Sequence, residues 1–102
     1  MPLYVVHYSH PDEKGWQEQL MPHVGWLREQ VAAGVLRASG PIADPDVKRA
    51  MLIIAAADEV AVRAVIATDP FAVHGLIADM SIAEWDPIFG AFNDDSTMAG
   101  KI

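Results

Sequence analysis

The sequence predicts an α+β domain in which strands and helices follow one another in the order β-α-β-β-α-β. Two segments repeat apolar residues every three or four positions, as amphipathic helices do. Four shorter segments are rich in β-branched, aromatic or other apolar residues, and Gly, Pro and Asp separate them. This order is typical of the ferredoxin-like fold, a four-stranded antiparallel sheet with two helices on one face.

Each element has its own signals. Strands are expected at residues 3–8, 35–39, 49–56 and 76–85, and helices at residues 16–33 and 59–68. Pro22 lies inside the first helix, which therefore either begins near Met21 or kinks there. Gly34 is a suitable end for that helix, and Asp58 is a suitable N-cap for the second one. The 102 residues suffice for one domain with one core, and residues 93–102 are expected to be a loose end.

The apolar composition of the third strand predicts a homodimer. Residues 49–56 are almost wholly apolar, so both faces of this strand should be buried. Two helices cover only one face of a four-stranded sheet. The simplest cover for the other face is the same face of a second copy, so we expect a two-fold homodimer that packs sheet against sheet.

Composition excludes several classes of function. The formal net charge is −7, with seven Lys and Arg against fourteen Asp and Glu, which argues against binding nucleic acid or anionic membrane surfaces. The chain has no Cys, so thiolate nucleophiles and disulfides are ruled out. The apolar runs are too short to span a bilayer, and the N-terminus has no basic lead of the secretory type. A cytoplasmic location is the expectation.

Two residues are the main candidates for chemistry. His23 shares a helix stripe with Leu20 and Leu27, so its ring should point toward the core, either as a general acid–base group or as a histidine satisfied by a backbone carbonyl. Asp69 precedes Pro70, where a helix must stop. It either caps the helix that follows or orients an imidazole, as acidic residues do in acid–base dyads.

Four further residues are candidate substrate contacts. Ser39 comes before a Gly-Pro turn, Phe71 offers an aromatic wall, and His7 and His74 add imidazoles. The four histidines match no metal-ligand spacing, so neither a metal nor a cofactor is expected. The sequence has no phosphate-binding loop, dinucleotide fingerprint or serine-nucleophile motif. A small aromatic ligand suits the aromatic residues of the chain.

Four blocks of the chain, in this order, resemble the YCII-related domain family. They are residues 21–27 (MPHVGWL), 34–41 (GVLRASGP) and 69–71 (DPF), and a last strand that ends in Trp85. The resemblance covers residues 3 to about 92. It implies a ferredoxin-like fold, a dimer related to the dimeric α+β barrels, and a site centred on His23 and Asp69. Neither Pro22 before the histidine nor His74 is a family requirement.

The ends of the chain, residues 2–8 and 84–90, resemble the branch of the family that contains chlorohydroxyhydroquinone dehydrochlorinases. This implies a cofactor-free enzyme that removes HCl from a chlorinated hydroxyhydroquinone, with His23 as base, Asp69 as its partner, and His7, Ser39, Phe71 and His74 as substrate contacts. Two alternatives stay open. One is a proton-transfer isomerase like the muconolactone isomerases. The other is a non-catalytic dimer that binds a small molecule or a protein.

Overall fold

The computed structural model describes residues 1–100 of the chain. The strands are β1 (Leu3–His10), β2 (Leu36–Ile42), β3 (Lys48–Ala55) and β4 (Ala78–Trp85), and the helices are α1 (Glu13–Ala32), α2 (Glu59–Ile66), α3 (Pro70–Val73) and the short 3-10 helix η1 (Asn93–Asp95). Within these residues, no helix combines the length and the apolar character needed to cross a bilayer.

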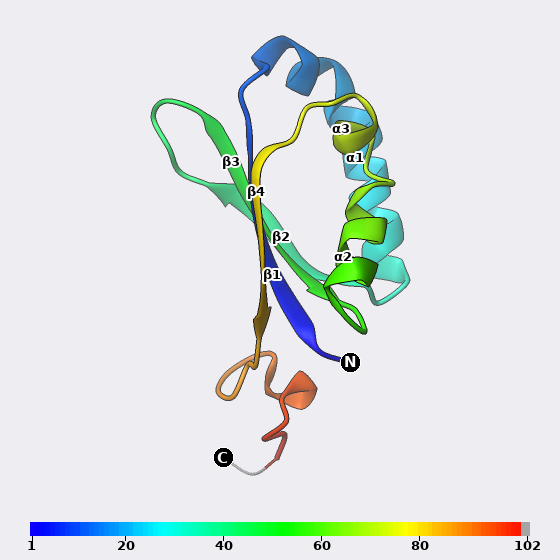
Figure 1. Ribbon diagram of the computed structural model, residues 1–102, viewed down its shortest axis with the longest axis vertical. Helices are drawn as coiled ribbons and strands as arrows, with labels where there is room; N and C mark the ends of the chain where they lie inside the picture. The colour runs from blue at the N-terminus through cyan, green and yellow to red at the C-terminus, as the bar shows by residue number, and fades with distance from the viewer. Residues whose placement is uncertain (101–102) are drawn as a thin grey trace.

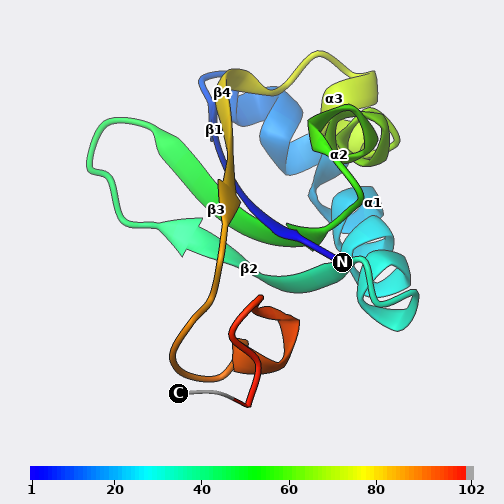
Figure 2. The ribbon, with the colours of Figure 1, turned by 60° about the horizontal axis from the view of Figure 1, so that its bottom comes forward.

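The four strands form one sheet in the order β2-β3-β1-β4, and each neighbouring pair is antiparallel. Helices α1, α2 and α3 all lie on one face of this sheet (Figure 1), and Figure 2 shows none of these three on the other face. The predicted ferredoxin-like α+β fold is confirmed. The homodimer stays a prediction.

The core lies between the sheet and the helices. Alternate residues of β1 point to the helix side, where they meet β3 and the buried faces of α1 and α2. The buried members of this cluster are Tyr4, Val6, Tyr8, Trp26, Leu36, Leu52, Ile54, Ala56, Val62 and Ile66. The strand parity of β1 therefore decides which of its side chains can reach a site under the helices.

Several boundaries differ from the prediction. Helix α1 begins earlier, because Asp12 caps it by accepting the Gly15 N–H at 3.0 Å, and Pro22 lies inside the continuous helix. Strand β2 continues through Gly40 and Pro41, which pair with β3. Proline is tolerated there because β2 is an edge strand. Strand β4 begins at Ala78 rather than residue 76, and α3 is an additional helix.

Residues 86–100 extend the molecule beyond the sheet, at the bottom of Figure 1. The loose end expected at residues 93–102 stays a prediction, and the structure shows which contacts residues 93–97 make. Asp95 forms an ion pair with Arg37 of β2, and the Asp86 carboxylate accepts hydrogen bonds from Ser96 and Thr97. These bonds lower the pKa of Asp86. Residues 101–102 of the predicted loose end lie outside the described part of the chain.

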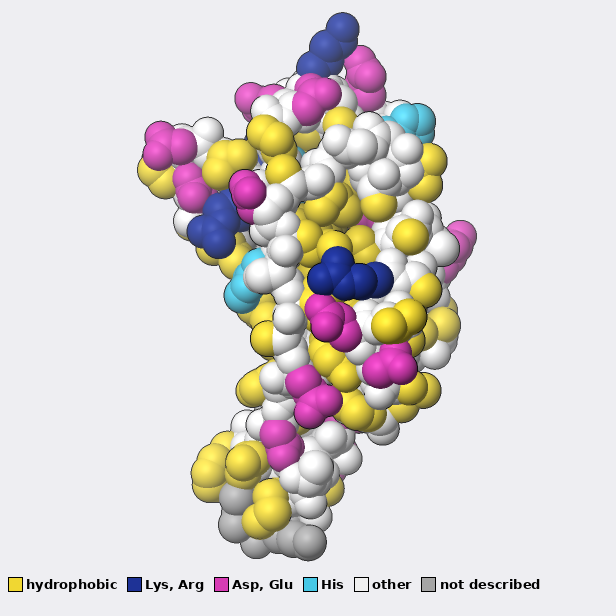
Figure 3. All heavy atoms as spheres, viewed as in Figure 1, with side chains coloured by type: hydrophobic (Ala, Val, Ile, Leu, Met, Phe, Trp, Pro, Cys, Tyr) yellow, Lys and Arg dark blue, Asp and Glu magenta, His cyan; other side chains and the backbone are white. Residues whose placement is uncertain are grey.

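Basic and acidic side chains are interspersed on the surface. On the face shown in Figure 3, the Lys and Arg side chains stand apart from one another and beside Asp or Glu. Three ion pairs on the surface follow this pattern: Lys48 with Glu13, Arg49 with Asp44, and Arg63 with Glu59. Figure 3 shows no basic patch on this face.

Gly15 sets how closely α1 approaches the segment that follows α3. A Cβ at Gly15 would lie 2.4 Å from Leu76 Cδ2 and 2.8 Å from Asp12 Oδ2, whereas a Cβ at Gly25 would meet nothing within 4 Å. We expect Gly25→Ala to raise the free energy of unfolding by about 0.5–1 kcal/mol, since alanine favours helix. Gly15→Ala should be about 1–3 kcal/mol less stable than Gly25→Ala, because of overpacking. Urea unfolding of both variants measures this, and equal stabilities would contradict the close packing.

Candidate functional site

The structure brings His23 and Asp69 together. The imidazole Nδ1 of His23 on α1 lies 2.8 Å from Asp69 Oδ1. The exposed fraction is 8% for His23 and 0% for Asp69, so the hydrogen bond between them is largely shielded from water. The partner of His23 is thus the carboxylate rather than a backbone carbonyl.

Asp69 also caps α3. Its Oδ1 accepts the Phe71 N–H at 3.0 Å, with Pro70 in the first turn of the helix. The two interpretations of this residue, helix cap and partner of an imidazole, therefore hold at once. Pro70 forces the chain out of α2, and the same turn aims the carboxylate at α1.

A third donor reaches the same carboxylate. The Tyr8 hydroxyl of β1 donates to Asp69 Oδ2 at 3.4 Å. Burial, reinforced by the Asp69 charge, raises the pKa of Tyr8 far above its usual value, so the phenol keeps its proton. An ionised carboxylate accepts all three hydrogen bonds without a proton of its own.

This arrangement fixes the tautomer of His23. Because Asp69 accepts at Nδ1, that nitrogen carries the proton of the neutral ring and Nε2 keeps its lone pair. Within residues 1–100, every fully buried side-chain nitrogen or oxygen has a hydrogen-bond partner. No partner of His23 Nε2 is present among them, so this atom remains accessible. A neutral imidazole with an accessible Nε2, held by a carboxylate at Nδ1, can act as a general base.

Stacking fixes the plane of the His23 ring. The ring stacks on Phe71 with 4.0 Å between centroids and an angle of 16° between planes. Trp26 stacks at 5.9 Å and donates its indole N–H to Thr68 Oγ1 at 2.8 Å. The dyad is therefore oriented by aromatic contacts as well as by the hydrogen bond.

A cavity of about 580 Å³ opens beside the His23 ring. Helix α1 forms one wall and the β2–β3 hairpin forms the other. The lining residues are His10, Trp16, Leu20, His23, Val24, Leu27, residues 39–44, residues 47–50 and Phe71. This volume lies within the range of small-molecule sites, about 300–1,000 Å³.

The six predicted site residues divide into two groups. Ser39 and Phe71 line the cavity together with His23, and Asp69 lies behind the His23 ring. His7 pairs with Met51 and Ser81 on the open face of the sheet, away from the helices. His74 is exposed at the end of α3. The latter two do not join the site.

Sequence reasoning missed His10. This residue is 4% exposed, lines the same cavity, and has its Nδ1 2.8 Å from the Leu76 carbonyl oxygen. It packs against Tyr8 and Phe71, with centroid distances of 4.9 Å and 4.6 Å. The alternation of β1 could have found it, because residue 10 shares the parity of Tyr8 rather than that of His7.

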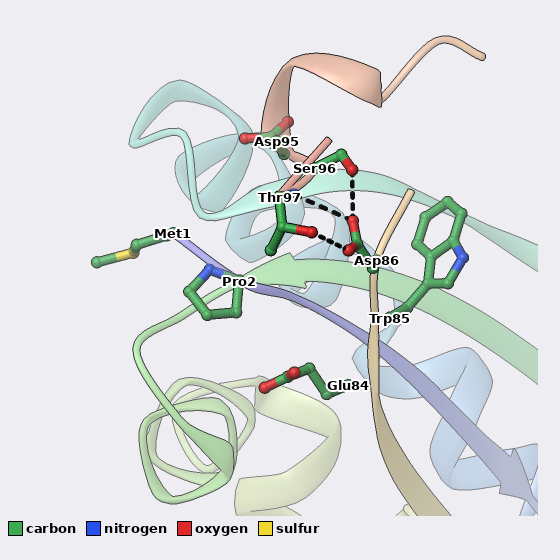
Figure 4. Close-up of a pocket in the computed structure, with 8 residues that line it drawn as sticks. All are labelled: Met1, Pro2, Glu84, Trp85, Asp86, Asp95, Ser96 and Thr97. Carbon is green, nitrogen blue, oxygen red and sulfur yellow. Dashed lines mark hydrogen bonds between the residues drawn. The ribbon is translucent and has the colours of Figure 1, made fainter. Parts of the chain in front are cut away.

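A second cavity, of about 330 Å³, lies at the other end of β1, between Met1, Pro2 and the tail (Figure 4). It contains carboxylates but no imidazole. Its Asp86 is occupied by Ser96 and Thr97, as Figure 4 shows. Glu84 accepts from the Tyr4 hydroxyl at 3.2 Å. In the described residues 1–100, no three His, Asp or Glu side chains are grouped to hold a metal ion. The cavity beside His23 is thus the better candidate site.

Comparison with known families identifies the family of the chain. The model of the YCII-related domain matches residues 1–86. The chain belongs to the YCII-related domain family. The blocks that carried the resemblance at the sequence level, including His23 and Asp69, all lie within this match. A search of curated proteins found no significant match.

Solved structures share the fold of this YCII-related chain. One is the 5-chloro-2-hydroxyhydroquinone dehydrochlorinase TftG from Burkholderia phenoliruptrix AC1100, in complex with 2,5-dihydroxybenzoquinone. It is 20% identical, with a TM-score of 0.67 over 82% of this chain and 93% of TftG. Another is an antibiotic biosynthesis monooxygenase, 16% identical, with a TM-score of 0.53 over 82% of this chain and 96% of that one. At these identities the likeness establishes the fold.

The triple role of Asp69 can be measured against Asp58, which caps α2 at the surface and accepts the Ala61 N–H. We expect Asp58→Ala to cost about 1 kcal/mol, the usual value of a cap. Asp69→Ala should cost at least about 2 kcal/mol more, because the donors of His23 and Tyr8 lose their acceptor in a buried place. Urea unfolding gives both numbers. Equal losses would reduce Asp69 to a helix cap.

Proposed function

We propose that this YCII-related protein is a cofactor-independent acid–base enzyme that acts on a small hydroxylated aromatic compound. The reaction that best suits the site is removal of HCl from a chlorinated hydroxyhydroquinone. The observation that carries this proposal is the 2.8 Å hydrogen bond between His23 Nδ1 and the buried Asp69, which leaves Nε2 accessible beside a cavity with largely apolar walls.

The shape of the site supports an aromatic substrate. Trp16 and Phe71 offer flat apolar surfaces, and their rings are nearly parallel, 26° apart. Ser39 supplies a hydroxyl on the opposite wall, which suits a hydrogen bond to an oxygen of the substrate. The fold neighbour TftG binds a dihydroxybenzoquinone, a ligand of this size and polarity.

The chemistry needs a base and a way to stabilise its charge. His23 Nε2 removes a proton from a ring hydroxyl, and the Asp69 carboxylate stabilises the imidazolium that forms. The hydroxyl carbon becomes a carbonyl, and the proton moves to the carbon that carries chlorine. Loss of a second hydroxyl proton then expels chloride and leaves a hydroxyquinone. No electron acceptor is required, because the electron pair departs with chloride.

The test is a chloride-release and quinone-absorbance assay on a panel of chlorinated hydroxyhydroquinones. His23→Asn keeps a side-chain N–H near the position of Nδ1, so the bond to Asp69 survives while the base is lost. We expect turnover to fall about 10²- to 10⁴-fold, the usual contribution of general acid–base catalysis. His74→Asn, outside the site, is the matched control and should turn over like the wild type.

Three outcomes separate the alternatives. Near-native turnover by His23→Asn would remove His23 from the role of base. A change of absorbance without chloride, on lactone substrates, would favour an isomerase. If the wild-type protein turns over no compound of the panel, this would contradict the proposed reaction and favour a non-catalytic binding dimer.

We also propose that the protein works as a homodimer through the open face of the sheet. On that face Val5 and Met51 stay partly exposed and Ile53 is buried, and none of the helices α1, α2 and α3 covers this apolar stretch (Figure 2). In a two-fold dimer, the same face of a second copy would cover this apolar stretch.

Ala83 tests the dimer, since it pairs with Val5 on the open face and is exposed in the single chain. Ala83→Glu should shift the protein to monomer in sedimentation experiments, because a desolvated charge opposes sheet packing. Ala64→Glu, on the exposed side of α2, should leave the oligomeric state unchanged. A monomeric wild type, or a dimer indifferent to Ala83→Glu, would contradict this interface.

A further inference from the structure

His10 is a second buried imidazole in the cavity of His23, and the mechanism above gives it no task. We propose that His10 Nε2 is a second proton acceptor, so that the site takes a ring with two hydroxyl groups and removes one proton at each end. This inference rests on the proposed function and narrows its substrate to a polyhydroxylated ring.

The hydrogen bonds of His10 define its tautomer. A backbone carbonyl only accepts, so the 2.8 Å contact with the Leu76 oxygen puts the ring proton on Nδ1. The lone pair is then on Nε2. Within residues 1–100, every fully buried side-chain nitrogen has a hydrogen-bond partner. Nε2 of His10 has no partner there, so this atom is not fully buried and stays accessible. In both His10 and His23, Nε2 is thus unprotonated and accessible.

Phe71 lies next to both imidazoles. It stacks on His23 at 4.0 Å and lies 4.6 Å from His10, measured between ring centroids. Both rings are therefore close to a single phenyl ring, and both line one cavity. Under this proposal, one substrate ring with hydroxyls at opposite ends contacts both imidazoles.

The surroundings of His10 favour its neutral form, in which Nε2 has a free lone pair. Burial lowers its pKa, and the nearby His23 adds to this, while the Leu76 carbonyl and the Asp69 carboxylate oppose it. Tyr8, its edge-on neighbour, remains a neutral phenol. Lys48 pairs with His10 across β1 and β3, and its Nζ lies 4.4 Å from the Trp16 ring and 3.7 Å from Glu13 Oε1.

The proton balance gives His10 its task. His23 takes the first hydroxyl proton and returns it to the carbon that carries chlorine, so His23 ends neutral. The second hydroxyl, at the opposite end of the ring, must still lose its proton while the carbon–chlorine bond breaks. His10 Nε2 receives that proton, chloride leaves with the electron pair, and the ring becomes a quinone. One HCl is lost in all, with its proton on His10.

His10→Asn tests this, because an Asn amide keeps an N–H for the Leu76 carbonyl and has no base at the position of Nε2. We expect turnover to fall about 10²- to 10⁴-fold with stability nearly kept. In the wild type, kcat/KM should fall on the acid side with the steepness of two protonations, and in His10→Asn with that of one. His74→Asn should keep both the rate and the steepness. Wild-type rates and an unchanged acid limb in His10→Asn would overturn the inference.

A second measurement needs neither turnover nor a variant. Nitrogen NMR of the wild-type imidazoles reports which ring nitrogen carries the proton. We expect His10 in the Nδ1–H form, and a shift of its Nε2 signal when 2,5-dihydroxybenzoquinone binds. The inference would be overturned if His10 has the proton on Nε2. It would also be overturned if the ligand shifts the His23 signal but leaves the His10 signal unchanged. A wild type that releases no chloride but passes this test would instead contradict the proposed reaction.

Discussion

The structure of the site depends on one buried carboxylate. Asp69 accepts from His23 of α1, from Tyr8 of β1 and from the backbone of α3, so three separate elements meet at two oxygens. A buried charge is costly unless hydrogen bonds compensate it, and here each donor comes from a different part of the chain. The same hydrogen bonds to Asp69 therefore hold α1 and α3 against the sheet and orient the His23 imidazole.

The sequence was sufficient for the fold and for this pair, for identifiable reasons. Periodicity separates the helices from the strands, and Pro70 marks the turn that positions Asp69. The extension of β2 through Pro41 was missed because proline argues against a strand unless the strand is known to lie at an edge, which depends on tertiary structure.

His7 and His10 show where local reasoning about the site ends. Both lie on β1, three residues apart, so strand alternation puts them on opposite faces of the sheet. Choosing between them requires knowing which face the helices cover. His10 also needs the Leu76 carbonyl, 66 residues away in sequence, to define its tautomer. Such a long-range backbone contact leaves no pattern in the residues themselves.

The charges around the cavity indicate what it admits. Its cations are compensated, Lys48 by Glu13 and Arg49 by Asp44, and Asp69 lies behind the His23 ring. The rest of the lining is largely apolar. A strongly anionic substrate would lose its hydration there without finding an uncompensated cation, whereas a neutral hydroxylated ring would lose little. In the proposed reaction, negative charge would arise only after binding, on substrate oxygens next to the imidazoles of His23 and His10. Interactions that form as charge develops favour the transition state over the bound substrate, which is the condition for catalysis.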